Sequence, residues 1–428
     1  MWIRRVAKVA VAISFVASAE TAGVTAILRR IRDAIFSTGT ANPSPTAAPG
    51  LERWLRHSVY LEQLGGQEKE HLTMRAEEWH LVSGAVSMRG RRPTDEDTVV
   101  VVAAIHSHKN IRIQALFDGH GGPNVAQFAA NRLQSLFARQ KGYSRRDLEK
   151  ICHNLDQELK KNNVRRGGAT GVIMVIEKVE KPEKVIVRGR QILKDPGLPP
   201  LKEQYRRQAS PAEEITLGTS EAPFRLHIAN VGDSRAMLVL EDEYYEMTKD
   251  HKPDDPEEKS RILRAGAVVT SSEGTSVSRI NGSLALSRSF GDFSLKQGSG
   301  STPDAVISTP DVRQFYAGYN DLLILFCDGV TEPAASSWPQ VAAYTREIFA
   351  QTSDVVKTAV ALAEQAYEAG SQDNLSAVVT RLRPEPAEDP AATLHAYAWM
   401  RGILRTVHTE DWSHRLDTAK SDFFLPLF

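Results

Sequence analysis

The order of the apolar segments constrains this chain more than any other feature. Segments with strand character are followed by two segments with helical spacing, and this grouping occurs twice. This order predicts an α+β fold in which two central sheets are covered by helices on their outer faces. The predicted strands are His80–Met88, Asp97–Ile105, Ile111–Phe117, Gly171–Glu177, Phe224–Val231, Arg235–Leu240, Leu322–Phe326 and Asn374–Leu382. The predicted helices are Gly122–Gln140, Tyr143–Lys161, Glu257–Ala265, Trp338–Gln351 and Asp354–Ala369.

The charge balance and the cysteine content exclude several classes of function. The 428 residues contain 53 Lys and Arg against 53 Asp and Glu, so no broad basic field favours nucleic acid. Two cysteines are too few for a disulfide framework. No apolar run reaches the roughly 20 residues that a membrane-spanning helix needs. We expect a monomeric globular protein with no transmembrane span and no nucleic-acid partner.

Residues 1–50 are predicted to be a targeting segment or a flexible extension. Residues 1–35 carry six basic and two acidic side chains, and Val9–Ala19 is apolar. A basic start, a short apolar run and the end Ala17-Ser18-Ala19 are typical of a secretory signal, whereas an arginine-rich, acid-poor segment is typical of a mitochondrial presequence. The second basic cluster favours the presequence. An untargeted extension on a cytoplasmic protein stays open.

Polar and proline-rich stretches divide the rest of the chain. Residues 51–78 are predicted to form a lead-in helix before a main domain at 79–383. Within that domain, residues 178–223 form an insertion rich in Lys, Glu and Pro, which we expect to be mostly solvated. Residues 384–428 form a C-terminal extension with a helical stretch predicted near Ala396–Val407.

Carboxylates recur where the predicted strands begin or end. One Asp beside a Gly indicates a turn and nothing more. Repeated placement of this kind, however, can bring several carboxylates to one edge of a sheet sandwich, where their repulsion calls for a cation. The motifs are Thr94-Asp95-Glu96-Asp97, Phe117-Asp118-Gly119-His120-Gly121-Gly122, Gly232-Asp233-Ser234, Gly291-Asp292, Cys327-Asp328-Gly329 and Gln372-Asp373-Asn374.

Oxygen donors of this kind suit Mg²⁺ or Mn²⁺. Two such ions can activate a water molecule and clamp the oxygens of a phosphoryl group during in-line displacement. His120 is a candidate general acid because the pKa of histidine lies near neutrality, and Arg91 and Arg92 are candidate phosphate ligands. Taken alone, His120 is equally a loop histidine, and the two arginines are equally a solvated basic turn.

These motifs, together with Gly90-Arg91-Arg92-Pro93 and the segment Asn281–Asp292, resemble in order and spacing those of the type-2C (PPM) family of protein phosphatases. The resemblance covers residues 79–383. It implies a four-layer αββα sandwich with two central antiparallel sheets. It also implies a metal-dependent serine/threonine phosphatase that uses two Mg²⁺ or Mn²⁺ ions and acts on phosphoproteins.

The resemblance implies metal-binding roles for six matched residues. Asp118 resembles the aspartate that bridges both ions, and Gly119 resembles the residue that gives its carbonyl. Glu96 resembles a ligand of one ion, while Asp328 and Asp373 resemble ligands of the other. Asp233 resembles a ligand of a weaker third ion.

Three further residues resemble those that handle the substrate. Arg92 resembles the phosphate-binding arginine, and His120 resembles the proton donor to the leaving oxygen. Asp97 resembles the acid that orients both the water and His120. The sequence departs from the family at Glu332, where an aspartate is usual, which concerns the third-ion site.

Two other hypotheses stay open. A pseudophosphatase would keep the fold for partner binding without turnover, although the intact acidic residues argue against it. A metal-dependent phosphatase of a small phosphorylated metabolite would share the same site, so only a comparison of substrates separates it from a protein phosphatase.

Overall fold

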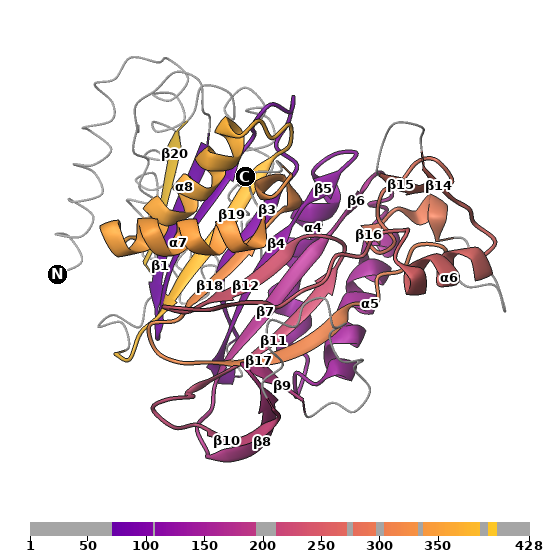
Figure 1. Ribbon diagram of the computed structural model, residues 1–428. Coiled ribbons are helices and arrows are strands. Elements are labelled where there is room, and N and C mark those ends of the chain that lie inside the picture. Colours follow the sequence, from indigo (N-terminus) through magenta and orange to yellow (C-terminus); the bar gives the residue numbers. More distant parts are fainter. Residues whose placement is uncertain are drawn as a thin grey trace, which may run out of the picture.

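Two large antiparallel sheets, one of seven strands and one of eight, lie face to face at the centre of the molecule (Figure 1). The computed structural model describes residues 71–105, 108–193, 211–271, 277–296, 304–332, 337–385 and 393–399. The first sheet has the order β13 (Tyr244–Glu246), β12 (Arg235–Val239), β18 (Leu322–Phe326), β19 (Leu375–Leu382), β2 (Leu81–Met88), β1 (His71–Glu78), β20 (Thr393–Trp399). The second has the order β10 (Glu213–Leu217), β8 (Glu183–Arg188), β9 (Gln191–Ile192), β17 (Asp311–Ala317), β11 (Phe224–Val231), β7 (Gly171–Lys178), β4 (His108–Phe117), β3 (Thr98–Ile105).

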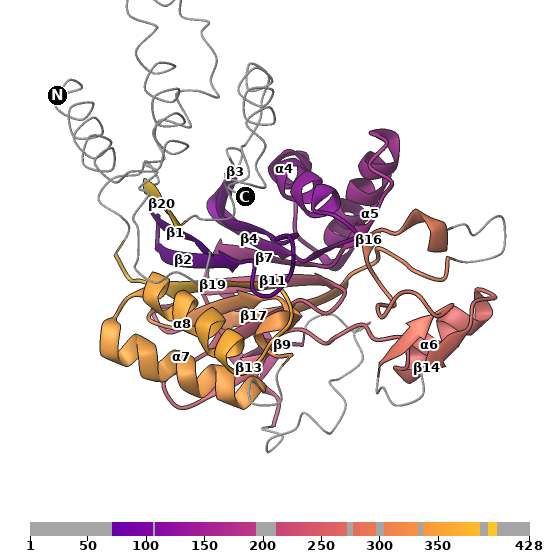
Figure 2. The ribbon, with the colours of Figure 1, turned by 90° about the horizontal axis from the view of Figure 1, so that it is seen from above.

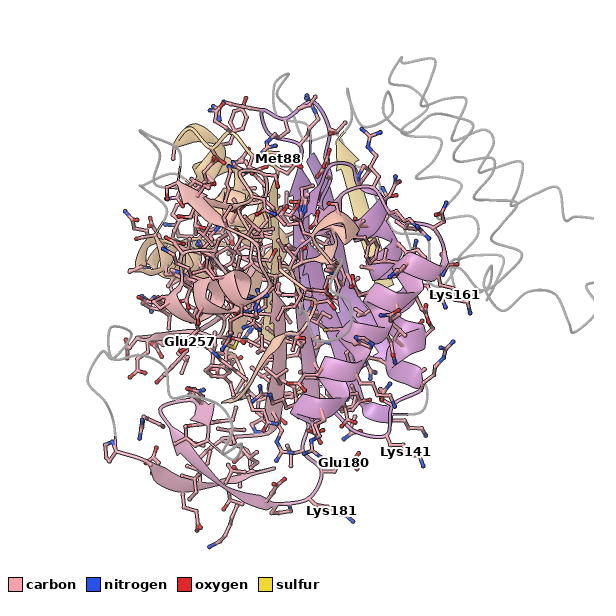
Figure 3. All side chains as sticks on the ribbon, turned by 90° about the vertical axis from the view of Figure 1, so that its right-hand side faces the viewer. Met88, Lys141, Lys161, Glu180, Lys181 and Glu257 are labelled. Atoms are coloured by element: carbon pink, nitrogen blue, oxygen red, sulfur yellow. The ribbon has the colours of Figure 1, made fainter. Side chains whose placement is uncertain are left out.

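Helices cover both outer faces, which completes four layers. Figure 2 shows α7 (Trp338–Thr352) and α8 (Val355–Glu368) on one side of the sheets, and α4 (Asn124–Ala138) and α5 (Arg145–Lys161) on the other. Exposed Lys141 lies in the connection between α4 and α5, and exposed Lys161 is the last residue of α5 (Figure 3). The predicted αββα sandwich is therefore confirmed. None of the described helices is long and apolar enough to span a bilayer.

Strand alternation explains why two cores form. In β7, Val172, Met174 and Ile176 belong to the core between the two sheets. The residues between them, Ile173 and Val175, pack instead against α4 and α5. Successive side chains of a strand point to opposite faces, so an uninterrupted apolar strand is buried on both sides.

The predicted lead-in helix is wrong for the part of it that the structure describes. Residues 71–78 form strand β1, which pairs along its whole length with β2. The two strands meet at a tight turn in which Trp79 has a positive φ of 58°. Residues 51–70 of the predicted helix and the whole 1–50 segment lie outside the described residues.

The helix predicted near Ala396–Val407 is also wrong where it can be compared. Residues 393–399 form strand β20, which pairs with β1. Strand pairing with a partner more than 300 positions away in the chain overrides local helix propensity. Strands β1 and β20 both lie outside the predicted 79–383 limits, so the first sheet extends beyond them.

The insertion predicted at 178–223 is more structured than expected. It contributes β8, β9 and β10, which extend the edge of the second sheet. These strands enclose a small apolar cluster that includes Val185, Val187 and Leu217. Glu180 and Lys181 are exposed on the loop that precedes β8 (Figure 3). Residues 194–210 are not among those described.

A smaller lobe lies beside the sandwich in both ribbon views. It contains α6 (Pro256–Arg264) and the hairpin β14 (Val269–Ser271) and β15 (Ser278–Ile280). A separate three-stranded sheet has the order β16 (Phe290–Gly291), β6 (Gly168–Ala169), β5 (Gly119–His120). Two short 3₁₀ turns, η2 (Phe293–Leu295) and η3 (Asp328–Val330), complete the elements of the described residues.

Candidate active site

The predicted acidic residues gather at one edge of the sandwich because of the antiparallel strand pairing. Thr98 at the start of β3 pairs with Phe117 at the end of β4, which makes Asp97 and Asp118 neighbours. Phe326 at the end of β18 pairs with Ala377 near the start of β19, and the Cys327 amide donates to the Ser376 carbonyl at 3.1 Å. We call this group the acidic edge; its members are Glu96, Asp97, Asp118, Asp233, Asp328 and Asp373.

Mutual repulsion dominates the acidic edge. The pKa of Asp118 is raised well above its ordinary value, first by burial and then by the charges of Asp97, Asp328, Asp233 and Asp373. Burial and the Asp233 carboxylate likewise raise the pKa of Asp328. These carboxylates therefore share one electrostatic environment that lacks enough positive charge to balance it.

Asp97 is the least satisfied of these side chains. It is 5% exposed, and neither of its carboxylate oxygens has a hydrogen-bond partner of normal geometry among the described residues, although the nearby Ser376 and Cys327 side chains lower its pKa in part. Burial and the neighbouring Asp95 carboxylate raise its pKa well above the ordinary value. Asp95 is better satisfied, since it accepts a hydrogen bond from the Ser87 hydroxyl at 2.7 Å, and burial raises its pKa to about 6. A buried carboxylate without partners is costly unless a cation or a donor completes it.

Glu96 is fixed by its local backbone. Its carboxylate accepts hydrogen bonds from the Thr94 hydroxyl at 3.0 Å and from the Gly122 amide at 2.9 Å. Its own amide donates to Oδ1 of Asn374 at 3.0 Å, which ties it to the start of β19. Gly119 lies directly against the Glu96 carbonyl, and a Cβ at that position would overlap this oxygen. The glycine is therefore required for the close approach of the two chain segments.

Two members of the acidic edge are paired with cations of the chain. Nη2 of Arg92 lies 2.9 Å from Oδ2 of Asp373, and Nε of Arg92 donates to the Gln372 carbonyl at 3.1 Å. The Lys252 ammonium forms an ion pair with Asp233. Asp233 raises the pKa of Lys252, although burial of the ammonium would lower it.

The acidic edge fits a metal ion by the chemistry of its donor atoms and not by their present spacing. No group of three or more Asp, Glu, His or Cys side chains in the described ranges converges closely enough to hold one ion. The donor set, however, consists of carboxylates and the Gly119 carbonyl, which are the ligands that Mg²⁺ and Mn²⁺ prefer. The unbalanced charge around Asp118 and the unpartnered oxygens of Asp97 are relieved by added positive charge.

His120 does not contact its expected partner. Its Nε2 lies 2.8 Å from Oδ2 of Asp292, whereas Asp97 was expected to orient it. The sequence motif Gly291-Asp292 had placed Asp292 at a strand end, but nothing in the sequence indicated that it would reach His120. Asp292 was thus a member of the acidic motifs without an assigned role, and the structure places it against His120.

Glu332 also has local partners. Its Oε2 accepts hydrogen bonds from the Ser371 hydroxyl and from the Gln372 amide, both at 2.7 Å. Asp233 is held by Lys252, as described above. The two residues that concern the predicted third-ion site are therefore each engaged elsewhere.

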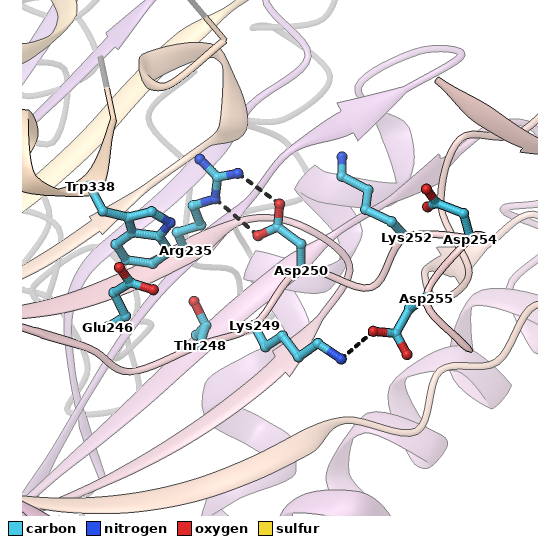
Figure 4. Close-up of a pocket in the computed structure, with 9 residues that line it drawn as sticks. All are labelled: Arg235, Glu246, Thr248, Lys249, Asp250, Lys252, Asp254, Asp255 and Trp338. Atoms are coloured by element: carbon cyan, nitrogen blue, oxygen red, sulfur yellow. Dashed lines mark hydrogen bonds and ion pairs between the residues drawn. The ribbon is translucent and has the colours of Figure 1, made fainter. Parts of the chain in front are cut away.

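A cleft of about 320 Å³ adjoins the acidic edge (Figure 4). Arg235 and Asp250 form a bidentate pair across it at 2.7 and 2.9 Å, and Lys249 pairs with Asp255. Trp338 forms one wall, and its ring lies 5.3 Å from the guanidinium of Arg235. Lys252 joins the cleft to the acidic edge, because it lines the cleft and pairs with Asp233.

Comparisons with known proteins agree with this architecture. A family model described as "Protein phosphatase 2C" matches residues 81–181 and 215–375, and the gap between the two parts lies inside the insertion. "Probable protein phosphatase 2C 2" of Paramecium tetraurelia is 33% identical over 287 residues, which are 64% of this chain and 79% of that protein. Human "Protein phosphatase 1B" is 29% identical over 300 residues, or 69% of this chain and 56% of that protein.

A solved structure extends the similarity to three dimensions. The crystal structure of a phosphatase from a pathogenic strain of Toxoplasma gondii has a TM-score of 0.69 and 34% sequence identity. It covers 76% of this chain and 99% of that chain.

Proposed function

The chain belongs to the protein phosphatase 2C family, and on this premise we propose that it hydrolyses phosphoserine and phosphothreonine in proteins with the help of two Mg²⁺ or Mn²⁺ ions. Members of this family are typically metal-dependent serine/threonine phosphatases. The observation that carries the proposal is the gathering of the acidic edge by strand pairing, which places Asp118 among four other carboxylates. Such a concentration of charge costs stability and is expected where a cation is to be bound.

The proposed ligands of the two ions are the carboxylates of Glu96, Asp118, Asp328 and Asp373, together with the carbonyl of Gly119. When bound, the ions would supply an activated water and neutralise charge on the phosphoryl group. Asp118 would have the bridging role, because it stands at the position of the bridging aspartate in the family motif and lies among the other proposed ligands Asp328 and Asp373.

The chain's own residues would bind the phosphate and move the proton. Arg92 is suited to the phosphate, since its side chain is 53% exposed and its guanidinium already binds one carboxylate. His120 would give a proton to the leaving seryl or threonyl oxygen. Asp97, beside Asp118, would hold the attacking water in position through its unpartnered oxygens.

Asp233 is the expected ligand of a weaker third ion. In this chain Lys252 already supplies it with a positive charge, so a third ion would have to displace an ammonium group. We therefore propose that the reaction needs only the first two ions.

The deciding experiment measures turnover of a phosphothreonyl and a phosphoseryl peptide by the purified full chain with Mn²⁺, with Mg²⁺ and with a chelator. Asp118→Asn should lower kcat at least about 100-fold, because the bridging ligand is lost. The matched control is Asp242→Asn, which changes an exposed aspartate in the turn between β12 and β13.

Four results would contradict the proposal. The first is turnover that persists in the chelator. The second is a loss in Asp118→Asn no larger than in the control. The third is a preference for small phosphorylated metabolites over both peptides, which would favour the metabolite hypothesis. A folded protein with no turnover on any substrate would favour a pseudophosphatase.

A further inference from the structure

We propose that Asp292 is the positioning residue for His120, and that it is itself held in place by a buried ion pair between α5 and the chain after β16. The inference rests on the proposed function, in which His120 gives a proton to the leaving oxygen. Asp292 would act through His120 and not on the substrate.

The contact between the two side chains fixes one ring nitrogen of the histidine. Oδ2 of Asp292 lies 2.8 Å from Nε2 of His120. An ionised carboxylate only accepts hydrogen bonds, so Nε2 carries the hydrogen in this pair. Nδ1 is then the nitrogen left to exchange a proton with a substrate. A histidine so held keeps one ring orientation. To act as the proton donor it must also carry a hydrogen on Nδ1, as the imidazolium does; that proton goes to the leaving oxygen, and the ring is left as the neutral tautomer with its hydrogen on Nε2.

Asp292 is held more firmly than an ordinary loop aspartate. It has a positive φ of 47°, and its amide donates to the Gly167 carbonyl at 3.0 Å. The Ser289 hydroxyl, which is fully buried, donates to the same Oδ2 at 2.5 Å. The carboxylate therefore has two donors in fixed positions, Ser289 and His120.

The three-stranded sheet of β16, β6 and β5 brings the pair together. Gly291 pairs with Gly168, and Gly168 pairs with His120. A Cβ on Gly168 would overlap both Oδ2 of Asp292 and Nε2 of His120. The histidine and the aspartate thus meet directly over the backbone of Gly168, in space that only glycine leaves free.

A buried ion pair supports the same segment from behind. Asp156 of α5 accepts a hydrogen bond from the Gly291 amide at 2.9 Å and lies 2.8 Å from the Lys296 ammonium. Lys296 also donates to the Ser289 carbonyl at 2.8 Å. The side chains of Lys296 and Asp156 are only 5% and 10% exposed. Helix α5 is thereby bound to the chain on both sides of Asp292.

A purely structural pair and a positioning pair differ in one measurable respect. If Asp292 only stabilised the fold, its loss would affect every substrate alike. If it positions a proton donor, its loss should matter most when the leaving group needs a proton. A threonyl alkoxide needs one, whereas p-nitrophenolate is stable as an anion near neutral pH.

The test compares Asp292→Asn with the wild-type full chain on a phosphothreonyl peptide and on p-nitrophenyl phosphate, both with Mn²⁺. We expect kcat for the peptide to fall about 100-fold and kcat for p-nitrophenyl phosphate to fall less than about fivefold. KM for the peptide should stay within about twofold, since Asp292 does not touch the phosphate. The matched control is Glu149→Gln, which likewise replaces a carboxylate by its amide, at a partly exposed position of α5.

Two further variants guard the result. Asp292→Asn in a His120→Ala background should cause no additional loss, because the two residues act as one unit. If Asp292→Asn fails to fold, Ser289→Ala serves in its place, because it removes one hydrogen-bond donor from Oδ2 of Asp292. We expect it to lower kcat for the peptide more than kcat for p-nitrophenyl phosphate, with smaller losses than Asp292→Asn.

A measurement without turnover separates this inference from the proposed function. The ¹⁵N shifts of the His120 ring should indicate a hydrogen on Nε2 in the wild type and a change in Asp292→Asn. Equal losses on both substrates, or an unchanged His120 tautomer, overturn the positioning role even if the phosphatase activity is established. No turnover by the wild type on either substrate overturns the catalytic role together with the proposed function, whatever the ring shifts.

Discussion

The carboxylates of the acidic edge and those beside α6 have opposite surroundings. At the acidic edge, burial and neighbouring acids raise the pKa values of Asp118 and Asp328. In α6, Glu258 lies 2.7 Å from Arg288 and 2.8 Å from Arg261 of the same helix. Burial alone would raise the pKa of Glu258, but the hydrogen bonds and charges of the two arginines together lower it to about 2.

The difference separates carboxylates that stabilise the folded state from carboxylates that destabilise it. Arg288 also lies 3.0 Å from Asp311, so one guanidinium joins α6 to the start of β17. A paired carboxylate of this kind adds stability at neutral pH, whereas an unbalanced cluster subtracts from it. Sites of function are where a protein tolerates such a cost. Three experiments can break or sharpen this comparison.

The largest effect is expected at Glu258. A pKa lowered from 4.5 to about 2 corresponds to about 3 kcal/mol of stability. Because the folded state has the lower pKa, this stability is present above about pH 5 and is lost as the pH falls toward about 2. Glu258→Gln should therefore be destabilised at neutral pH and approach the wild type in acid, as measured by urea unfolding across this range. If the difference in unfolding free energy between the two proteins does not change with pH, the Glu258 carboxylate does not stabilise the fold through its ionised form.

The second effect concerns the metal. Mn²⁺ at about 100 times its Kd should stabilise the folded chain by about 2.7 kcal/mol, because it binds the folded state alone. Thermal unfolding in Mn²⁺ and in a chelator measures this shift. Asp118→Asn should lose most of the shift, while Glu258→Gln should keep it in full. An equal shift in both variants would mean that the ion binds away from the acidic edge.

The smallest effect has the opposite sign. In a chelator, Asp118→Asn should be more stable than the wild type by about 1 kcal/mol, because a repelled charge is removed. A raised pKa means that the ionised form is the unfavourable one, so the gain should be larger at about pH 8 than at about pH 5. A destabilised Asp118→Asn protein in chelator would show that the repulsion is balanced by contacts of Asp118 itself.

Much of the fold was predictable because it depends on local apolar patterns. The strand predicted at Leu322–Phe326 has the same limits in the structure, and the helix predicted at Trp338–Gln351 differs by one residue at its end. Strand β17, at Asp311–Ala317, was missed because Arg313 is buried beside Val312 and interrupts the alternation. Strand β20 was missed because it is defined by its pairing with the distant β1. Strand β1 was missed because its polar residues, such as Arg75 and Glu77, obscure the apolar pattern, although it pairs with its neighbour β2.

The candidate site was predictable in its members more than in its contacts. Motif order identified the acidic residues, and strand pairing brings them to one edge. The contact between His120 and Asp292 spans 172 positions and depends on the absence of a side chain at Gly168. A contact between two distant segments over one glycine produces no hydrophobic periodicity by which it could be predicted from the sequence.

Lys252 has a consequence for how the charge at Asp233 is balanced. A dissolved ion leaves its site when its concentration falls below its Kd. An ammonium group on the same chain has a fixed effective concentration at the carboxylate, whatever the composition of the solution. Dilution or a chelator cannot remove this tethered counter-ion from Asp233. The positive charge that balances Asp233 is therefore part of the polypeptide and does not depend on the concentration of metal ions in solution.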